Sequence, residues 1–171
     1  AIGHAAAPWI ARQDADDVSH PVRFQSQMGQ LVKNSEIVIL GTWYEGIDEK
    51  GKRLYRMALP VTDQGIKRWL RTINCLCHGS VIFSKDLFMR VGGYPEQYPF
   101  AQDYALWLRF SKAAKIENIP ETLYQRRIHE GAISQSNQER WQVLQQLKLD
   151  AGLIGEQEGL KWLIEQREFE N

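Results

Sequence analysis

Three carboxylates stand within four residues in the acidic turn Asp14-Ala15-Asp16-Asp17. Crowding such charges costs free energy unless a positive charge lies among them. A divalent cation is the natural partner, because Mg²⁺ and Mn²⁺ prefer oxygen ligands and commonly bridge one or two protein carboxylates to the phosphates of a nucleotide. The alternative is a solvated acidic turn in which one Asp caps a helix. A bare D-x-D spacing favours that alternative, so the surrounding residues must decide.

Two further charged residues are candidates for chemistry. Asp103 stands where a helix should begin, beside Tyr104 and Trp107, and an enclosed carboxylate can serve as a general base. Its structural alternative is an ordinary acid favoured by the helix macrodipole. Arg12, just before the acidic turn, could donate two hydrogen bonds to a phosphate or could neutralise Asp14. Both alternatives stay open at this point.

The two cysteines do not indicate a metal site or a disulfide. Cys75 and Cys77 precede His78 with part of a zinc-site spacing, but no second cysteine pair completes a tetrahedron. We therefore predict buried or partly buried thiols. The sequence also shows no secretory segment and no apolar run of membrane-spanning length, which favours a reducing, aqueous compartment.

Composition narrows the class of protein further. The chain has 171 residues, 43% of them apolar and 25% charged, with 21 Lys and Arg balancing 21 Asp and Glu. This excludes a disordered or low-complexity chain and favours one compact domain. A chain of this length buries enough surface to fold without a metal or a disulfide, so a metal would serve chemistry. Zero net charge argues against nucleic acid as a partner.

The elements that must position these residues can be read from periodicity. Trp9–Arg12 predicts a short strand that leads into the acidic turn. A helix should follow Pro21, with an apolar stripe of Phe24, Met28, Leu31 and Val32. The aliphatic run 36–43 predicts a central strand covered on both faces.

The later elements follow in order. We expect a hairpin turn at 47–52 and then a helix capped by Thr62, with Ile66, Trp69, Leu70 and Ile73 on its apolar face. A strand at 80–83 should lead to a short helix that Ser84 caps and Gly92-Gly93 ends. A helix from near Gln102, strands at 116–119 and 123–128, and two amphipathic helices from Gln135 onward, joined around 152–159, should follow. Trp69, Trp107 and Trp141 fit helix stripes and are expected in the core.

An ordered series of motifs resembles the family 2 glycosyltransferases, which are nucleotide-sugar enzymes of the GT-A fold. The series covers roughly residues 5 to 136, and its specificity lies in the order of the pieces. The matching segments are Ile10-Ala11-Arg12-Gln13-Asp14-Ala15-Asp16-Asp17, Pro21-x-Arg23 with Gln27, Asn74-x-x-x-His78-x-Ser80, Val91-Gly92-Gly93-Tyr94, Ala101-Gln102-Asp103-Tyr104 with Trp107 and Arg109, Ile119-Pro120-Glu121, and Arg126-Arg127-x-His129 with Ser134.

The resemblance implies an α/β fold with a GT-A-like (Rossmann-like) mixed sheet flanked by helices. Residues 1–134 would be part of the catalytic domain, similar to its C-terminal part, and residues 135–171 a C-terminal helical extension. The implied activity is inverting, metal-dependent transfer of a sugar from a nucleoside-diphosphate sugar to an acceptor hydroxyl.

The resemblance also implies roles for single residues. The implied assignments are Asp103 as general base, Arg12 and Asp14 at the nucleotide sugar, Asp16 and His129 at a Mn²⁺ or Mg²⁺ ion, and His78, Ser80 and Gln102 on the acceptor side. For His129 a packed or surface imidazole is an equal alternative, because such a cation prefers oxygen.

The beginning of the chain departs from the family pattern. Family members place a nucleotide-binding strand and further units before the acidic turn, whereas here little precedes Trp9. We therefore expect that the nucleotide-binding strands are absent, that the chain is weakly active or inactive alone, and that one sheet edge is unpaired. A homodimer, a partner covering that edge, or a longer parent protein would each account for this.

Two other functions compete with this interpretation. One is a non-catalytic binding or assembly module derived from the same fold, motivated by the short beginning. The other is a phosphatase of the haloacid dehalogenase type, which also has a D-x-D after a strand. That family needs an apolar run before the first Asp, whereas Arg12-Gln13 stand here. The family-level expectation is bacterial surface polysaccharide synthesis, with a glycan or lipid-linked acceptor, in the cytoplasm or at the inner face of the membrane.

Overall fold

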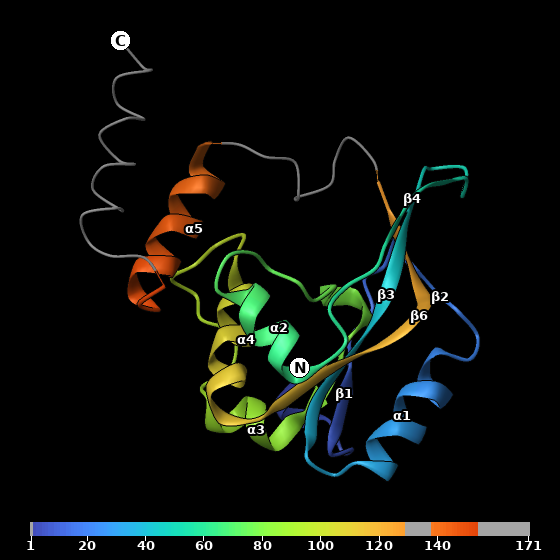
Figure 1. The fold of residues 1–171 in the computed structure, drawn as a ribbon, viewed down its shortest axis with the longest axis horizontal. Coiled ribbons are helices and arrows are strands. Elements are labelled where there is room, and N and C mark those ends of the chain that lie inside the picture. Colours follow the sequence, from blue (N-terminus) through green and yellow to red (C-terminus); the bar gives the residue numbers. More distant parts are fainter. Residues whose placement is uncertain (1, 129–137, 154–171) are drawn as a thin grey trace.

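A computed structural model describes residues 2–128 and 138–153 of the chain (Figure 1). The strands are β1 (Trp9–Ala11), β2 (Val18–Ser19), β3 (Ile37–Ile47), β4 (Arg53–Met57), β5 (Ile82–Ser84) and β6 (Lys115–Arg127). The helices are α1 (Arg23–Lys33), α2 (Asp63–Leu70), α3 (Lys85–Arg90), α4 (Gln102–Ala113) and α5 (Gln138–Asp150), with 3₁₀ turns at Ile2–His4 and His78–Ser80.

These strands form one mixed sheet. Its order is β1-β5-β3-β6-β2, with β4 paired to β3 outside that path. The long strands β3 and β6 run parallel, and the other pairs are antiparallel. The predicted central strand is confirmed as the first half of β3, which continues through the predicted hairpin into β4. β1, the strand that leads into the acidic turn, lies at one end of the order.

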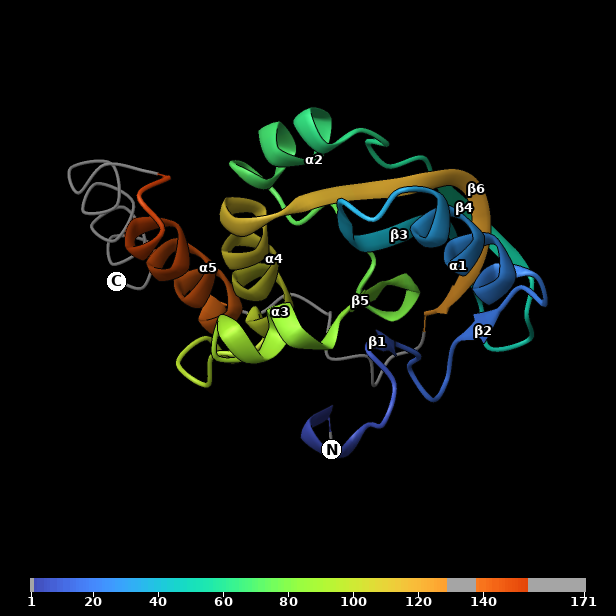
Figure 2. The ribbon, with the colours of Figure 1, turned by 90° about the horizontal axis from the view of Figure 1, so that it is seen from below.

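Helices cover both faces of the sheet (Figure 2). On one face Ile39, Phe83 and Ile116 join α2, α3 and α4 in the larger core. On the other face Leu40 and Ile82 pack toward α1. Adjacent residues of β3 and β5 thus point to opposite cores, as the two-residue repeat of a strand requires.

The buried face of α1 differs from the predicted one. Phe24 is 44% and Val32 80% exposed, while Arg23 and Gln27 are completely buried together with Leu31. The predicted apolar stripe is therefore wrong for two of its four members. Hydrogen bonds explain the difference, because both buried side chains donate to backbone carbonyls in the loop and strand beneath α1.

Those bonds tie α1 to the region of the site. Arg23 donates to the carbonyls of Gly79 at 2.7 Å and Arg12 at 2.6 Å. Gln27 donates from one amide nitrogen to the carbonyls of Leu40 at 2.7 Å and Ser80 at 2.8 Å. Buried carbonyls need such partners, so polar side chains at these positions replace apolar packing.

β6 is one strand where the sequence predicts two. Ile119 pairs with Thr42 and Thr122 pairs with Trp43, so Pro120 and the residue after it have no opposite partner in β3. This bulge accommodates a proline, which lacks an N–H group for the ladder, and lets the strand continue beyond it.

The predicted caps are confirmed on two short helices. The Thr62 hydroxyl accepts a hydrogen bond from Gly65 N–H at 3.3 Å, and Ser84 accepts one from Leu87 N–H at 3.3 Å. Helix α2 buries Ile66 but leaves Trp69 45% exposed, so the expected burial of Trp69 is wrong. By contrast, Trp107 is completely buried as predicted.

The described part of the C-terminal region packs on the sheet domain. Leu147 of α5 is 3% exposed and belongs to the larger core, and Tyr98 donates a hydrogen bond of 2.6 Å to Asp150. The division at residue 134 and the burial of the Trp141 side chain stay predictions, and the second expected helix lies outside the described residues. No described helix has the length and apolar character needed to cross a membrane.

Candidate functional site

The site begins where β1 ends, at the pair Arg12 and Asp14. Arg12 Nη2 donates to Asp14 Oδ1 at 2.5 Å, and both side chains are partly exposed. The carbonyl of Arg12 is held by the buried Arg23 at 2.6 Å. Arg12 Nε is buried and has no hydrogen-bond partner among the described residues. Arg12 therefore both neutralises Asp14 and keeps a further donor.

His78 lies against this pair. Its Nδ1 is 3.4 Å from Arg12 Nη2, and its Nε2 is 2.8 Å from the Tyr94 hydroxyl. Because a guanidinium only donates, Nδ1 is the acceptor and Nε2 carries the proton, which it donates to Tyr94. Burial lowers the pKa of His78, and the negative charges of Asp103 and Asp14 oppose that shift. Burial therefore disfavours the charged form of this imidazole.

Asp103 occupies the first turn of α4, where the helix dipole favours negative charge. Its Oδ2 accepts a hydrogen bond of 2.8 Å from the Asn74 side-chain amide, and its Oδ1 accepts one of 2.8 Å from Tyr104 N–H. Both oxygens are thus oriented, and each keeps capacity to accept a proton. The side chain is half-buried, so a substrate hydroxyl could reach it.

Asp14 and Asp103 converge on the same pair of side chains. Burial is the main cause that raises the pKa of Tyr94 to about 12, and the charges of Asp103 and Asp14 add to it. The same two carboxylates act on the pKa of His78. The structure thus brings two acids that are far apart in the sequence near the same two side chains, His78 and Tyr94.

The third carboxylate of the turn, Asp17, holds the turn in place. Its Oδ2 accepts a 2.7 Å hydrogen bond from the Tyr124 hydroxyl, which itself accepts one of 3.2 Å from Asp14 N–H. Its Oδ1 accepts a 2.8 Å bond from Arg127 N–H. Burial raises the pKa of Asp17, and these hydrogen bonds oppose that rise. The acidic turn is therefore attached to the end of β6.

Tyr124 can reach the turn because Gly79 lies beneath its ring. A Cβ at position 79 would collide with the Tyr124 hydroxyl and ring. Sequence reasoning assigned no role to Tyr124, Tyr94 or Asn74. Asn74 and Tyr94 belong to the matching segments Asn74-x-x-x-His78 and Val91-Gly92-Gly93-Tyr94, which were the available signals. The role of Tyr124 depends on how β6 lies beside the turn.

Asp16 is the exposed carboxylate of the turn, and its carbonyl accepts a 2.9 Å hydrogen bond from Arg127 Nε. Within residues 2–128 and 138–153, no three His, Cys, Asp or Glu side chains group closely enough to hold a metal ion by themselves. A divalent ion bound to a diphosphate needs only one or two protein carboxylates. Both Asp17 oxygens accept hydrogen bonds and Asp14 pairs with Arg12, and a metal ion at Asp16 stays a prediction.

The remaining predicted residues differ in burial and position. Ser80, expected on the acceptor side, is completely buried, and its hydroxyl donates to the Cys77 carbonyl at 3.0 Å. Gln102 is exposed beside Asp103. His129 lies outside the described residues. Cys75 and Cys77 are buried free thiols as predicted, and burial raises the pKa of each to about 12.

Comparison with known proteins decides the family. The sequence model of "Glycosyl transferase family 2" matches residues 1–92. The chain belongs to this family. The match covers the acidic turn and His78 and ends before Asp103, so it does not single out the C-terminal part of a catalytic domain.

Individual relatives agree with the family. The chain is 35% identical over 116 residues to amylovoran biosynthesis glycosyltransferase AmsE of Erwinia amylovora, covering 67% of this chain and 42% of AmsE. It is 30% identical over 116 residues to an Escherichia coli "UDP-Gal:alpha-D-GlcNAc-diphosphoundecaprenol beta-1,3-galactosyltransferase", with 67% of this chain and 42% of that enzyme covered. The chain therefore spans less than half of either relative.

The fold has a counterpart among solved structures. The crystal structure of S. aureus TarS 1-349 superposes with a TM-score of 0.61 at 14% identity, covering 85% of this chain and 41% of TarS. At this identity the likeness concerns the fold alone. It supports the mixed α/β sheet flanked by helices that the sequence predicts.

Proposed function

We propose that the chain supplies the metal and acceptor side of an inverting glycosyltransferase of the GT-A type. Such an enzyme transfers a sugar from a nucleoside-diphosphate sugar to an acceptor hydroxyl. The observation that carries this proposal is that Arg12 links Asp14 to His78, which contacts Tyr94 at 2.8 Å, and that the charge of Asp103 also acts on this His78–Tyr94 pair. Family membership supplies the class of reaction.

Asp103 has the geometry of the general base. Its two oxygens are fixed by Asn74 and by Tyr104 N–H, so the carboxylate has a defined direction. The acceptor oxygen attacks the anomeric carbon on the face opposite the diphosphate. A carbon–oxygen bond forms there while the bond to the diphosphate breaks, and the acceptor proton passes to Asp103. One such displacement inverts the anomeric centre.

Arg12 and Asp16 stand on the diphosphate side of this proposal. Arg12 Nε is a buried donor without a partner among the described residues, which suits a phosphate oxygen. Asp16 would hold Mn²⁺ or Mg²⁺, and the bound ion would compensate the charge of the leaving diphosphate. Asp14 would contact the ribose or base side while it keeps Arg12 oriented. His129 stays a proposed second ligand.

The acceptor class rests on the relatives. AmsE takes part in amylovoran biosynthesis by its name, and the E. coli galactosyltransferase acts on a diphosphoundecaprenol-linked sugar by its name. We extend these to a glycan or lipid-linked acceptor in bacterial surface polysaccharide synthesis. The protein would then act in the cytoplasm or at the inner face of the membrane.

The test measures binding and transfer separately. Calorimetry of the 171-residue chain with a panel of nucleoside diphosphates should show heat that requires Mn²⁺. Transfer from the matching sugar donor to bacterial lipid or glycan extracts should fall about 10²–10⁴-fold in Asp103→Asn, the range that general-base catalysis contributes. Asp86→Asn is the matched control, because Asp86 is an exposed acid on α3 that pairs with Arg90 at 3.0 Å. Absence of metal-dependent heat would favour the non-catalytic assembly module instead.

A further inference from the structure

The hydroxyl of Tyr94 is a polar group of the site that the proposed reaction does not yet use. Tyr94 stands in the loop between α3 and α4, and its side chain is partly exposed. Its oxygen is 2.8 Å from His78 Nε2, and the two rings meet edge to face with their centroids 5.6 Å apart. Tyr94 is therefore fixed beside the imidazole that also contacts Arg12.

Helix α4 holds the backbone that presents Tyr94. Arg109 of α4 donates to the Val91 carbonyl at 3.0 Å and to the Gly93 carbonyl at 3.4 Å. Gly93 has a φ of 69°, a conformation that glycine adopts readily, and its N–H donates to the Phe88 carbonyl at 2.9 Å. The rings of Phe88 and Tyr94 pack with centroids 5.3 Å apart. The helix that carries the proposed base thus also anchors the loop of Tyr94.

The direction of the bond between His78 and Tyr94 leaves one proton without an acceptor. His78 Nδ1 faces Arg12 Nη2 at 3.4 Å, and a guanidinium only donates, so the proton of the neutral imidazole is on Nε2. Nε2–H donates to the Tyr94 oxygen, so the Tyr94 O–H must point elsewhere. Among the described residues, His78 is the one hydrogen-bond partner of this hydroxyl. Tyr94 therefore keeps a donor for a ligand.

The surroundings of Tyr94 keep this hydroxyl protonated. Burial is the main cause that raises its pKa to about 12, the charge of Arg12 opposes the rise, and the charges of Asp103 and Asp14 add to it. At neutral pH Tyr94 is thus a neutral donor and not a base. The same charges show that Tyr94 lies within electrostatic reach of both the proposed diphosphate side and the proposed base.

The parts of the substrate differ in how well they suit this donor. The attacking hydroxyl uses its proton on Asp103 and its lone pair on the anomeric carbon, so a further donor to that oxygen would weaken the attack. The charged diphosphate is matched by the charged donor Arg12. In a displacement from the opposite face, the sugar ring lies between the attacking and the leaving oxygen. Its neutral hydroxyls suit a neutral donor within reach of both ends.

We propose that the Tyr94 hydroxyl donates a hydrogen bond to one hydroxyl oxygen of the transferred sugar. Tyr94 then determines specificity, because a deoxy sugar without this hydroxyl leaves the donor unpaired. The substrate class is accordingly a sugar that keeps the hydroxyl. This inference rests on the proposed function, which supplies the sugar donor. His78 is a positioning residue here, since it acts through Tyr94.

The test compares nucleoside diphosphates with their sugar esters by calorimetry of the full chain in Mn²⁺. The pairs are UDP with UDP-galactose and UDP-glucose, and GDP with GDP-mannose. We expect one sugar ester to bind more tightly than its diphosphate. Tyr94→Phe should weaken that binding about two- to tenfold, the range of one neutral hydrogen bond, and leave the affinity for the diphosphate unchanged. Tyr98→Phe, which removes a hydroxyl that donates to Asp150 at 2.6 Å, is the matched control.

Deoxy analogues of the sugar ester that binds most tightly separate recognition of a hydroxyl from support of the site. Each analogue lacks one hydroxyl. One analogue should bind Tyr94→Phe as well as it binds the unmodified chain, because the donor then has no acceptor to lose, while the other analogues keep the difference. A merely structural role of Tyr94 would weaken the binding of every ligand, the diphosphate included, by a similar factor.

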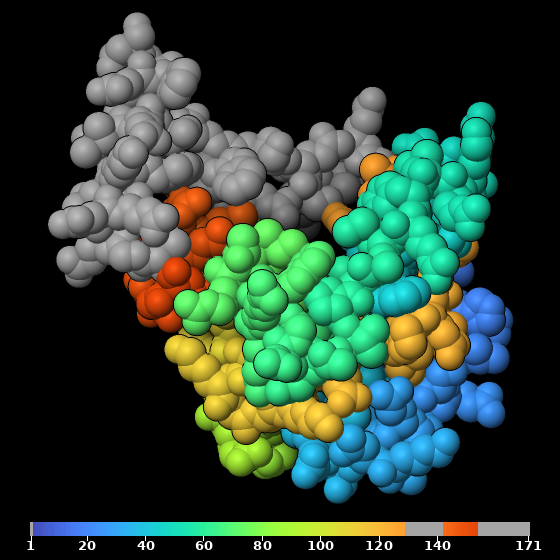
Figure 3. Space-filling model, viewed as in Figure 1, coloured from blue at the N-terminus to red at the C-terminus, as the bar shows by residue number. Residues whose placement is uncertain are grey.

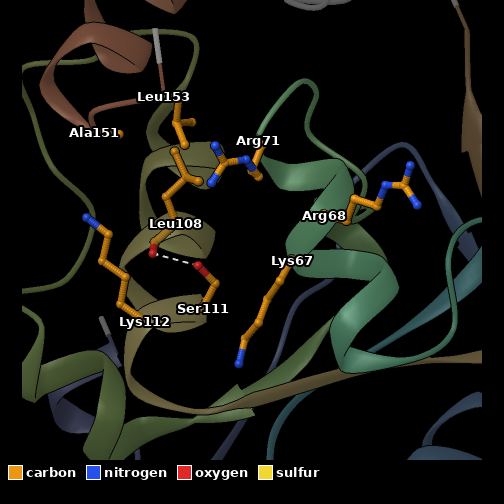
Figure 4. A pocket seen from close by; sticks show the side chains of 8 residues that line it. All are labelled: Lys67, Arg68, Arg71, Leu108, Ser111, Lys112, Ala151 and Leu153. Carbon is orange, nitrogen blue, oxygen red and sulfur yellow. Dashed lines mark hydrogen bonds between the residues drawn. The ribbon is translucent and has the colours of Figure 1, made fainter. Parts of the chain in front are cut away.

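A second place on the molecule attracts anions and requires its own control. A groove of about 370 Å³ between α2 and α4 has the cations Lys67, Arg68, Arg71 and Lys112 in its lining (Figure 4). Its wall α2 lies on the face of the molecule seen in Figure 3. Arg71→Glu/Lys112→Glu should remove any diphosphate bound there and leave the difference between sugar ester and diphosphate unchanged.

Several outcomes would overturn the proposal. They are equal binding of diphosphates and sugar esters by the unmodified chain, an equal loss of both in Tyr94→Phe, and the same loss with every deoxy analogue. Nitrogen NMR of the ligand-free chain checks the premise, and a proton on Nδ1 of His78 would also overturn it, because Tyr94 would then donate to His78. Absence of Mn²⁺-dependent binding of any diphosphate contradicts the proposed function itself, whereas binding that ignores the sugar contradicts this inference alone.

Discussion

The side-chain amide of Asn74 donates a 2.8 Å hydrogen bond to Oδ2 of Asp103 and so joins the loop after α2 to the first turn of α4. Of the two bonds that orient this carboxylate, it is the one made by another side chain; the other comes from Tyr104 N–H. Asn74 is thus a positioning residue for the proposed base. It can be altered without touching the carboxylate itself.

Asn74→Ala should lower kcat about tenfold and leave the KM for the sugar donor unchanged. The reason is that one hydrogen bond to a charged group is lost at the base while the diphosphate side stays intact. Steady-state kinetics at saturating acceptor measure the split. A rise in donor KM with normal kcat would mean that Asn74 acts in donor binding and not on Asp103.

Asp16→Asn should abolish the Mn²⁺-dependent part of nucleoside diphosphate binding, because an amide is a weaker ligand for a hard cation than a carboxylate. Removal of the metal with a chelator should have the same effect on the unmodified chain. Calorimetry measures both. Asp48→Asn is not a suitable control, since Asp48 orders the β3–β4 turn by accepting from Lys50 and Lys52 N–H. Asp86→Asn serves instead.

Tyr124→Phe should reduce the free energy of unfolding by about 1–3 kcal/mol, because it leaves an oxygen of the partly buried Asp17 and the N–H of Asp14 without their partner. It should also raise the donor KM, since Asp14 and Asp16 would be held less firmly. Urea denaturation and donor kinetics measure the two effects. Unchanged stability would show that water replaces the hydroxyl at no cost.

Gln27→Leu should destabilise the chain more than Phe24→Ala does, although Leu is more hydrophobic than the Gln it replaces. Gln27 is completely buried and supplies hydrogen bonds to the carbonyls of Leu40 and Ser80, whereas Phe24 is 44% exposed. Leaving two buried carbonyls unpaired costs about 1–3 kcal/mol each. Urea denaturation of both variants is the measurement. A greater loss of stability in Phe24→Ala would support the buried face of α1 that the sequence pattern predicts.

His78 should make stability depend on pH below neutrality. Burial holds the pKa of His78 below its usual value near 6.5, so the unfolded chain binds more protons than the folded chain between those two values. Stability is therefore fully present above about pH 6.5 and falls as the pH drops below it. Denaturation from about pH 5 to 8 should show a shallower acid slope for His78→Gln than for the unmodified chain. His4→Gln, at an exposed position, should keep the original slope.

Local signals explain which parts of the fold were predictable. The capping hydroxyls of Thr62 and Ser84 and the aliphatic run of β3 each specify an element from its own residues, and all three were confirmed. The face of α1 was not predictable in this way, since the burial of Gln27 is explained by hydrogen bonds to Leu40 and Ser80, residues distant in the sequence. The same holds for β6, where the bulge at Pro120 depends on pairing with β3.

In the site, too, some residues could be predicted from the sequence and others could not. Asp14 and Asp103 were proposed from the resemblance to a family, and their convergence on His78 emerges only in three dimensions. Tyr124 was missed because a tyrosine in a strand has no chemical signature of its own. Its contact with Asp17 follows from the position of β6 relative to the acidic turn. Ser80 was expected on the acceptor side, and the structure shows it completely buried, with its hydroxyl donating to the Cys77 carbonyl.

The contact between Gly79 and Tyr124 links two positions that a mutational library would otherwise sample independently. Any side chain at position 79 meets the Tyr124 ring, so it can be accommodated only together with a smaller residue at position 124. Each such compensated pair would lose the hydroxyl that bridges Asp14 and Asp17. Second-site suppressors of a Gly79 substitution should therefore recover folding without recovering an ordered acidic turn, and selections for abundance and for activity would yield different sets of survivors.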